Sequence, residues 1–141
     1  MRILGIDFGI KRMGLAISDE MGMMGHGIAT LTRKNPEYDS RELRKTIEKY
    51  SPETIVVGLP KNMDGSLGPA AQQVLDFVDY LKQTFSLPVE TWDERLSTVE
   101  AERVMLEADM SRRKRKKNVD KIAAAIILQG YLDYINRNQS L

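Results

Sequence analysis

The chain has 141 residues, 42% of them hydrophobic and 29% charged, which is typical of a soluble globular protein and fits one domain over residues 1–141. It contains no cysteine and one histidine, which excludes disulfide bonds, thiolate metal sites and cysteine nucleophiles and argues against a histidine-rich metal centre. There is no apolar run long enough to span a membrane and no secretory leader, so we expect a cytoplasmic protein with no membrane partner.

The formal net charge of +1 hides a strong asymmetry along the chain. Six consecutive cations are Arg112, Arg113, Lys114, Arg115, Lys116 and Lys117, and without them 15 basic residues face 20 acidic ones. Affinity for nucleic acids comes largely from neutralising phosphates, so this run predicts a contact with a nucleic-acid backbone. A solvated, mobile loop is the commoner explanation of such a charge run, and the two explanations combine in a flexible loop that becomes ordered on binding.

The first part of the chain predicts an antiparallel meander of strands at about 2–8, 13–19 and 25–30. From Asp39 or Ser40 to Tyr50, apolar residues recur every three or four positions, which predicts a helix.

The later elements alternate between strand and helix patterns. They are a buried strand at 54–59, a helix from about Pro69 to Thr84, a short strand at 89–92, a helix from the capping box Ser97–Glu100 to about Ala108, and a helix from Asn118 or Val119 to about Asn136. This order predicts an α/β fold, in which a mixed central sheet of the antiparallel meander plus parallel strands is flanked by helices.

Asp7 lies in the apolar first strand, between Gly5 and Gly9. A buried carboxylate is costly unless something compensates its charge. An acid in this place is what a metal-dependent phosphoryl-transfer site requires, provided that partner acids exist elsewhere.

Two other segments supply such acids. Asp93 and Glu94 directly follow a predicted strand, where ligands gather in sheets of this kind, although a solvated loop is an equally good explanation. Asp120 begins the last helix on the same face as Ala123, Ala124 and Ile127, which predicts that it points towards the sheet. A first-turn acid stabilised by the helix dipole is the simpler explanation, but it does not require an inward orientation. A site that offers only carboxylate ligands, with no histidine or cysteine, suits Mg²⁺ or Mn²⁺. Two such ions are able to activate a water molecule that attacks a phosphodiester.

At this point the chain resembles a known family. The matching motifs are Gly5-Ile6-Asp7-Phe8-Gly9, Gly14–Asp19, Val57-Gly58-Leu59-Pro60 with Asn62–Gly65, Asp93–Thr98 and Asp120–Ala124, and they look like those of the YqgF family. Its members are described as Holliday junction resolvases of the RuvX type and as the nuclease that matures the 5′ end of 16S rRNA.

The resemblance implies an RNase H-like fold and a nuclease that depends on Mg²⁺ or Mn²⁺. It implies catalytic acids at Asp7, Glu94 and Asp120, with Asp7, Glu94 or Asp93, and Asp120 as metal ligands. Of the neighbouring pair, Glu94 is favoured because it would match the glutamate that related resolvases place after the fourth strand. The implied partners are pre-16S rRNA or branched DNA, together with ribosomal particles, and the resemblance leaves open whether the protein is a monomer or a homodimer.

Further residues at the predicted strand ends suit a substrate backbone. Lys61 and Asn62 follow the strand that Pro60 ends, and Arg95 either contacts phosphate or pairs with a catalytic acid.

Two other functions remain alternatives. Sugar kinases and actin-like ATPases also carry Gly-x-Asp-x-Gly on a first strand, but their architecture needs a second related domain, for which 141 residues leave little room. A non-catalytic nucleic-acid-binding factor in ribosome biogenesis is the other alternative.

Overall fold

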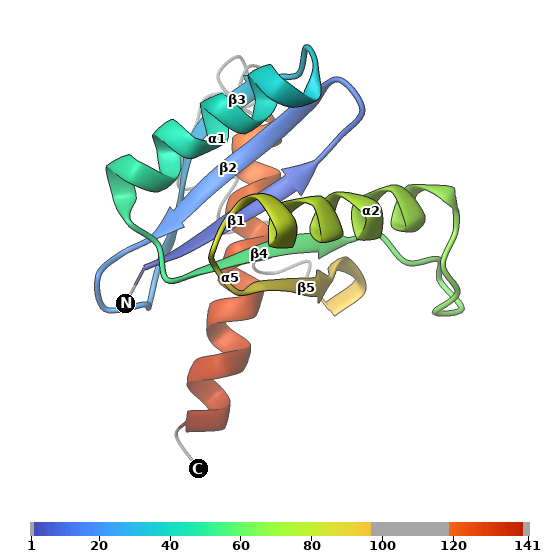
Figure 1. The fold of residues 1–141 in the computed structure, drawn as a ribbon. Coiled ribbons are helices and arrows are strands. Elements are labelled where there is room, and N and C mark those ends of the chain that lie inside the picture. The colour runs from blue at the N-terminus through green and yellow to red at the C-terminus, as the bar shows by residue number, and fades with distance from the viewer. Residues whose placement is uncertain (1, 97–118, 140–141) are drawn as a thin grey trace.

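A computed structural model describes residues 2–96 and 119–139 (Figure 1). Its centre is a five-stranded sheet in the order β3-β2-β1-β4-β5. The strands are β1 (Ile3–Phe8), β2 (Arg12–Ser18), β3 (Gly25–Thr32), β4 (Thr54–Leu59) and β5 (Val89–Asp93). The predicted helix from Ser97 to Ala108 and the basic run at 112–117 lie outside the described residues.

The predicted mixed sheet is confirmed. β1 pairs antiparallel with β2 and β2 with β3, while β1 and β4 are parallel, as are β4 and β5. β3 extends to Thr32, past the expected end at Thr30, and β5 includes Asp93 as its last residue. Glu94 then begins the short 3₁₀ helix η1 (Glu94–Leu96).

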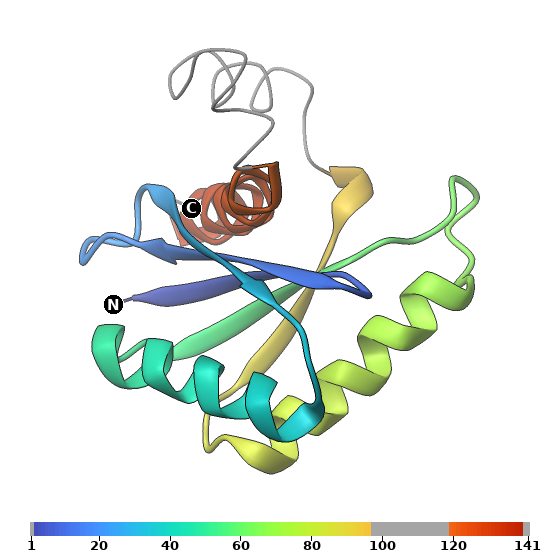
Figure 2. The ribbon, with the colours of Figure 1, turned by 90° about the horizontal axis from the view of Figure 1, so that it is seen from above.

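Helices cover both faces of the sheet. α1 (Pro36–Tyr50) and α2 (Pro69–Thr84) lie on one face and α5 (Val119–Gln139) on the other, as Figure 2 shows. The two faces have separate cores. Leu4, Ile6 and Phe8 of β1 pack with residues of α1 and α2, whereas Ile3 packs with α5 residues such as Leu128. Because side chains alternate along a strand, Asp7 belongs to the α5 face.

α1 begins earlier than expected. The predicted start was Asp39 or Ser40, but Asn35 caps the helix by accepting a 2.8 Å hydrogen bond from the Tyr38 amide, and Pro36 occupies the first turn. The expected first residue, Asp39, is therefore inside the helix and only 6% exposed. A polar first turn concealed this start, because only the later residues carry the apolar repeat.

Within the described ranges, no helix has both the length and the apolar character needed to cross a lipid bilayer.

Candidate active site

Asp7 and Asp120 are brought together by a close approach of α5 to the sheet. Asp7 is paired in register with Gly14 of β2. A Cβ atom on Gly14 would lie 1.8 Å from the backbone oxygen of Asp120, a distance that excludes any side chain there. Gly14 therefore allows the first turn of α5 to lie directly on β2, beside Asp7.

Glu94 reaches the same face from the other side of β1. A Cβ atom on Gly58 of β4 would lie 3.1 Å from the carboxyl carbon of Glu94 and 2.5 Å from the Ile127 side chain. Gly58 thus leaves room for the Glu94 carboxyl group between β4 and α5. Since β4 is the neighbour of β1, Glu94 and Asp120 approach Asp7 from opposite sides.

The charges of these carboxylates interact. Burial raises the pKa of Asp7, and the charge of Asp120 raises it further. Burial also raises the pKa of Glu94 to about 7, with smaller contributions from the charges of Asp7 and Asp93. Asp7 is therefore the acid that is electrostatically coupled to both of the others. Strongly perturbed carboxylates of this kind are characteristic of functional sites.

Asp93 is engaged differently from Glu94. Its carboxylate forms a 2.7 Å ion pair with the Nη2 atom of Arg95, and the Arg95 Nε donates to both of its oxygens at 3.1 Å. The hydrogen bond from Arg95 lowers the pKa of Asp93, and Lys61 adds a smaller effect of the same sign. These contacts hold Arg95 beside the site.

Three of the predicted substrate contacts lie in or next to the loop after β4. Arg95 donates to the Met63 carbonyl at 3.3 Å, so it joins the end of β5 to the loop after β4. The Asn62 side chain donates to Ser66 Oγ at 3.0 Å, so it stabilises the turn of this loop. Lys61 acts on Asp93 through its charge and is the cation of this loop nearest to the strand ends.

Arg12 is a residue that the sequence reasoning missed. It begins β2, and its Nε atom lies 3.0 Å from Oδ2 of Asp120. Its side chain is 58% exposed, so it also faces the solvent from which a substrate arrives. The available signal was a cation directly after the glycine turn that follows Asp7, but its partner was 108 positions away.

The acids fit a divalent cation by their chemistry. Asp7, Glu94 and Asp120 offer only oxygen ligands. Burial first, and repulsion between the acids second, raise the pKa of Asp7 and Glu94, and a cation between them would offset both effects. Their present geometry is not that of a closed centre, because no three His, Cys, Asp or Glu residues in the described part are grouped closely enough to hold an ion. In this geometry Oδ2 of Asp120 is paired with Arg12.

Comparison with solved structures defines the class of fold. The chain matches RuvC of Thermus thermophilus in complex with a Holliday junction substrate, with a TM-score of 0.65, 15% identity and coverage of 98% of this chain and 96% of that chain. It also matches the fowlpox virus Holliday junction resolvase, with a TM-score of 0.55, 15% identity and coverage of 95% and 99%. The fold is thus the RNase H-like fold of these resolvases, as predicted.

Comparison with sequences identifies the family. Residues 1–134 match the family described as RuvX, Holliday junction resolvase, and the chain belongs to it. A protein of Halothermothrix orenii is 57% identical over 137 residues, which cover 97% of this chain and 98% of the relative. One of Clostridium acetobutylicum is 56% identical over 135 residues, covering 96% and 100%. Both relatives bear the name "Putative pre-16S rRNA nuclease".

Proposed function

We propose that this protein is a divalent-metal-dependent nuclease that hydrolyses phosphodiester bonds, and that its substrate is the 5′ end of pre-16S rRNA. The observation that carries the chemistry is the coupling of Asp7 to both Glu94 and Asp120 on the α5 face of the sheet. The substrate follows from the names of the two relatives, each more than half identical over nearly the whole chain. On this proposal the protein acts on ribosomal particles or their precursor RNA.

Asp7, Glu94 and Asp120 would hold Mg²⁺ or Mn²⁺ through their carboxylate oxygens. When bound, such an ion lowers the pKa of a water molecule and stabilises the charge on the leaving oxygen. The chain itself supplies the burial around Asp7 and Glu94, which keeps water from screening the charges at the site. Glu94, with its pKa near 7, is also suited to accept or return a proton at neutral pH.

Cations flank these acids where a phosphate backbone would pass. Lys61 follows β4 and Arg95 lies in η1, and both act on Asp93, the last residue of β5. Arg12 begins β2 and pairs with Asp120, so the acids have basic groups on both sides. Phosphate contacts of this kind position a nucleic acid without reading its sequence. The basic run Arg112–Lys117 is proposed to add affinity for the backbone.

The test is cleavage of a 5′-extended 16S precursor by the purified protein, with Mn²⁺ and with EDTA. We expect cleavage in Mn²⁺ only, and Asp7→Asn should reduce the rate at least about a hundredfold, as removal of one transition-state contact does in other enzymes. Glu48→Gln is the matched control, because Glu48 is exposed on α1, across the sheet. Equal activity of Asp7→Asn and the control would refute the assignment of the acids.

A second candidate substrate is branched DNA, which the family description favours. A four-way junction in the same assay, with the same variants, separates the two candidates by their relative rates. Specific binding of either nucleic acid without metal-dependent cleavage would instead support a non-catalytic factor.

A further inference from the structure

A cavity of about 420 Å³ lies on the other side of β1 from the acids. It is bounded by the end of β1, the turn before β2, the start of α1 and the middle of α2, and its wall includes Phe8, Ile10, Arg33, Gln73, Asp76 and Phe77. Phe8 follows Asp7 directly and points to the α1 and α2 face, whereas Asp7 points to the α5 face. The cavity and the acids therefore share one strand end, and its size is in the range of small-molecule sites.

One wall of the cavity is a stack of planar groups. The rings of Phe8 and Phe77 are 4.2 Å apart with an angle of 22° between their planes. The guanidinium carbon of Arg33 lies 4.4 Å from the centre of the Phe8 ring. The Phe8 ring is thus sandwiched between Phe77 and Arg33, so a ligand would stack on the outer plane of one of these two groups. Aromatic rings and guanidinium planes are the surfaces on which proteins stack unpaired bases.

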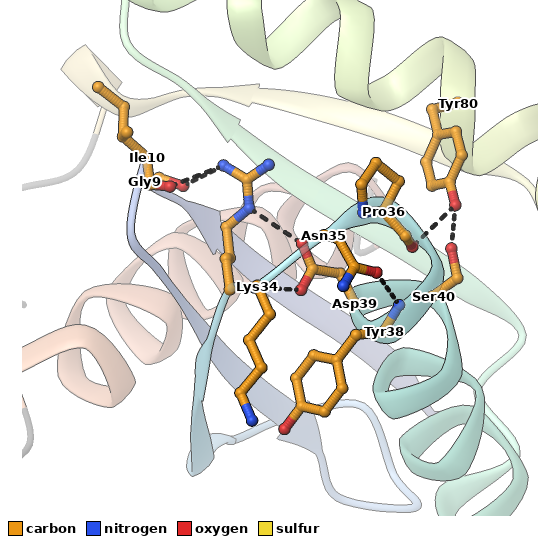
Figure 3. Close-up of polar contacts among 10 residues, drawn as sticks. Gly9, Ile10, Lys34, Asn35, Pro36, Tyr38, Asp39, Ser40 and Tyr80 are labelled. Carbon is orange, nitrogen blue, oxygen red and sulfur yellow. Dashed lines mark hydrogen bonds and ion pairs between the residues drawn. The ribbon is translucent and has the colours of Figure 1, made fainter.

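The Arg33 side of the cavity is held rigidly. Arg33 donates through Nη1 to the carbonyl oxygens of Gly9 at 2.8 Å and Ile10 at 3.1 Å, and its Nε lies 3.3 Å from Oδ2 of the buried Asp39. The partners Gly9, Ile10 and Asp39 are labelled in Figure 3. The cavity wall is thus organised before any ligand arrives, which lowers the cost of binding.

A second contact closes the opposite side. The Tyr80 hydroxyl of α2 donates to the carbonyl oxygen of Pro36 at 3.3 Å and contacts the Ser40 hydroxyl, so α2 is tied to the first turn of α1 (Figure 3). Pro36 and Tyr80 both line the cavity.

The charge of the lining favours a base over a phosphate. Arg33 is neutralised by Asp39, which leaves Asp76 as the remaining charge of the lining. A carboxylate repels phosphate but accepts hydrogen bonds from the amino groups of adenine, cytosine and guanine. Asp76 accepts one hydrogen bond, from Gln72 Nε2 at 3.2 Å, and an ionised carboxylate is able to accept several. Ile10, 75% exposed at the rim, adds an apolar contact for the ligand.

We propose that this cavity binds one unpaired, amino-bearing nucleobase of the nucleic-acid substrate, close to the phosphate that lies at Asp7. The proposal rests on the proposed function and narrows its substrate. A base in the cavity lies on the opposite face of the sheet from the acids, so it cannot be paired in a duplex. The substrate is then single-stranded at the cut.

The test measures binding of a single-stranded RNA to Asp7→Asn protein, so that cleavage does not interfere. Replacing the bases one at a time by abasic sites should weaken binding about tenfold at one position near the cut, the size expected for a lost stacking contact. Uridine at that position should bind more weakly than adenosine or cytidine. Asp76→Ala removes the acceptor and should abolish this preference. Ile10→Ala removes an apolar contact with the base, so replacing the base by an abasic site should weaken binding by a smaller factor in this variant than in the unaltered cavity.

Asp79→Ala is the matched control, since Asp79 is exposed on the same helix but lies outside this cavity. The proposal is overturned if no abasic position weakens binding, or if the base preference survives in Asp76→Ala or is equally lost in Asp79→Ala. Cleavage by the unaltered protein is measured separately, so these binding results do not test the nuclease function itself.

Discussion

The Nε atom of Arg12 lies 3.0 Å from Oδ2 of Asp120, which joins the start of β2 to the start of α5. This ion pair places a cation against one of the three acids that we propose to bind metal. Arg12 and an incoming ion therefore compete for the same carboxylate.

Replacing Arg12 by glutamine should tighten Mn²⁺ binding by up to about fivefold, since an exposed ion pair contributes at most about 1 kcal/mol. Metal-free stability should fall by less than that amount. Calorimetric titration of Mn²⁺ checks the first effect and urea unfolding the second. Arg2→Gln is the control, because it removes an ion pair with Glu20 instead, and weaker Mn²⁺ binding in Arg12→Gln alone would contradict the competition.

Gly14→Ala should separate α5 from the sheet. Its Cβ atom would collide with backbone, whereas that of Gly58→Ala would meet the flexible end of Ile127. We expect Gly14→Ala to cost about 3 kcal/mol or more and Gly58→Ala about 1–2 kcal/mol, as overpacking does elsewhere. Both should lower nuclease activity, Gly58→Ala by displacing Glu94. Urea unfolding and cleavage assays measure the two effects, and equal stability losses would contradict the close approach of α5 to β2.

Metal-free protein should lose stability as the pH rises from about 4.5 to 7. The folded pKa of Glu94 is about 7 against an ordinary 4.5, so the folded state binds more protons than the unfolded state in this window. The stability contributed by protonated Glu94 is fully present below pH 4.5 and is lost above about pH 7. The raised pKa of Asp7 acts in the same direction. In EDTA, the melting temperature of Glu94→Gln should therefore rise relative to that of the unaltered protein as the pH increases. A constant difference between pH 5 and 8 would show that Glu94 is not perturbed.

Asp39→Ala should destabilise the protein by about 2–4 kcal/mol, because it leaves a partly buried cation and a backbone donor without their acceptor. Asp39 accepts from the Lys34 amide at 3.0 Å and pairs with Arg33 at 3.3 Å. Asp39→Asn should cost less, since an amide oxygen still accepts from Lys34. Glu42→Ala is the control on the same helix, where the loss of an exposed pair with Lys45 should cost under about 1 kcal/mol. Chemical unfolding of the three variants gives the order, and equal costs for the Asp39 and Glu42 substitutions would contradict it.

Several elements could be predicted because their signals are local. Thr54–Leu59 reads as a buried strand and Pro69–Thr84 as an amphipathic helix, and both occur at the predicted positions. The start of α1 at Pro36 was missed, since it depends on a cap by Asn35 and on burial of Asp39 against Arg33. A periodic pattern of apolar residues does not report either contact.

Some features of the candidate site could likewise be predicted from local signals, and others could not. Residue types and the periods of strands and helices were enough to predict the order of the described elements, the oxygen-only character of the acids and the inward face of Asp120. The Asp93–Arg95 ion pair joins residues two positions apart, and the sequence left open whether Arg95 pairs with an acid or contacts phosphate. Three other relationships required the folded chain: Glu94 turns towards Asp7, Arg12 reaches Asp120, and a cavity lies behind Phe8. These relationships depend on how closely α5 and α2 approach the sheet, which is set by contacts between residues far apart in the chain.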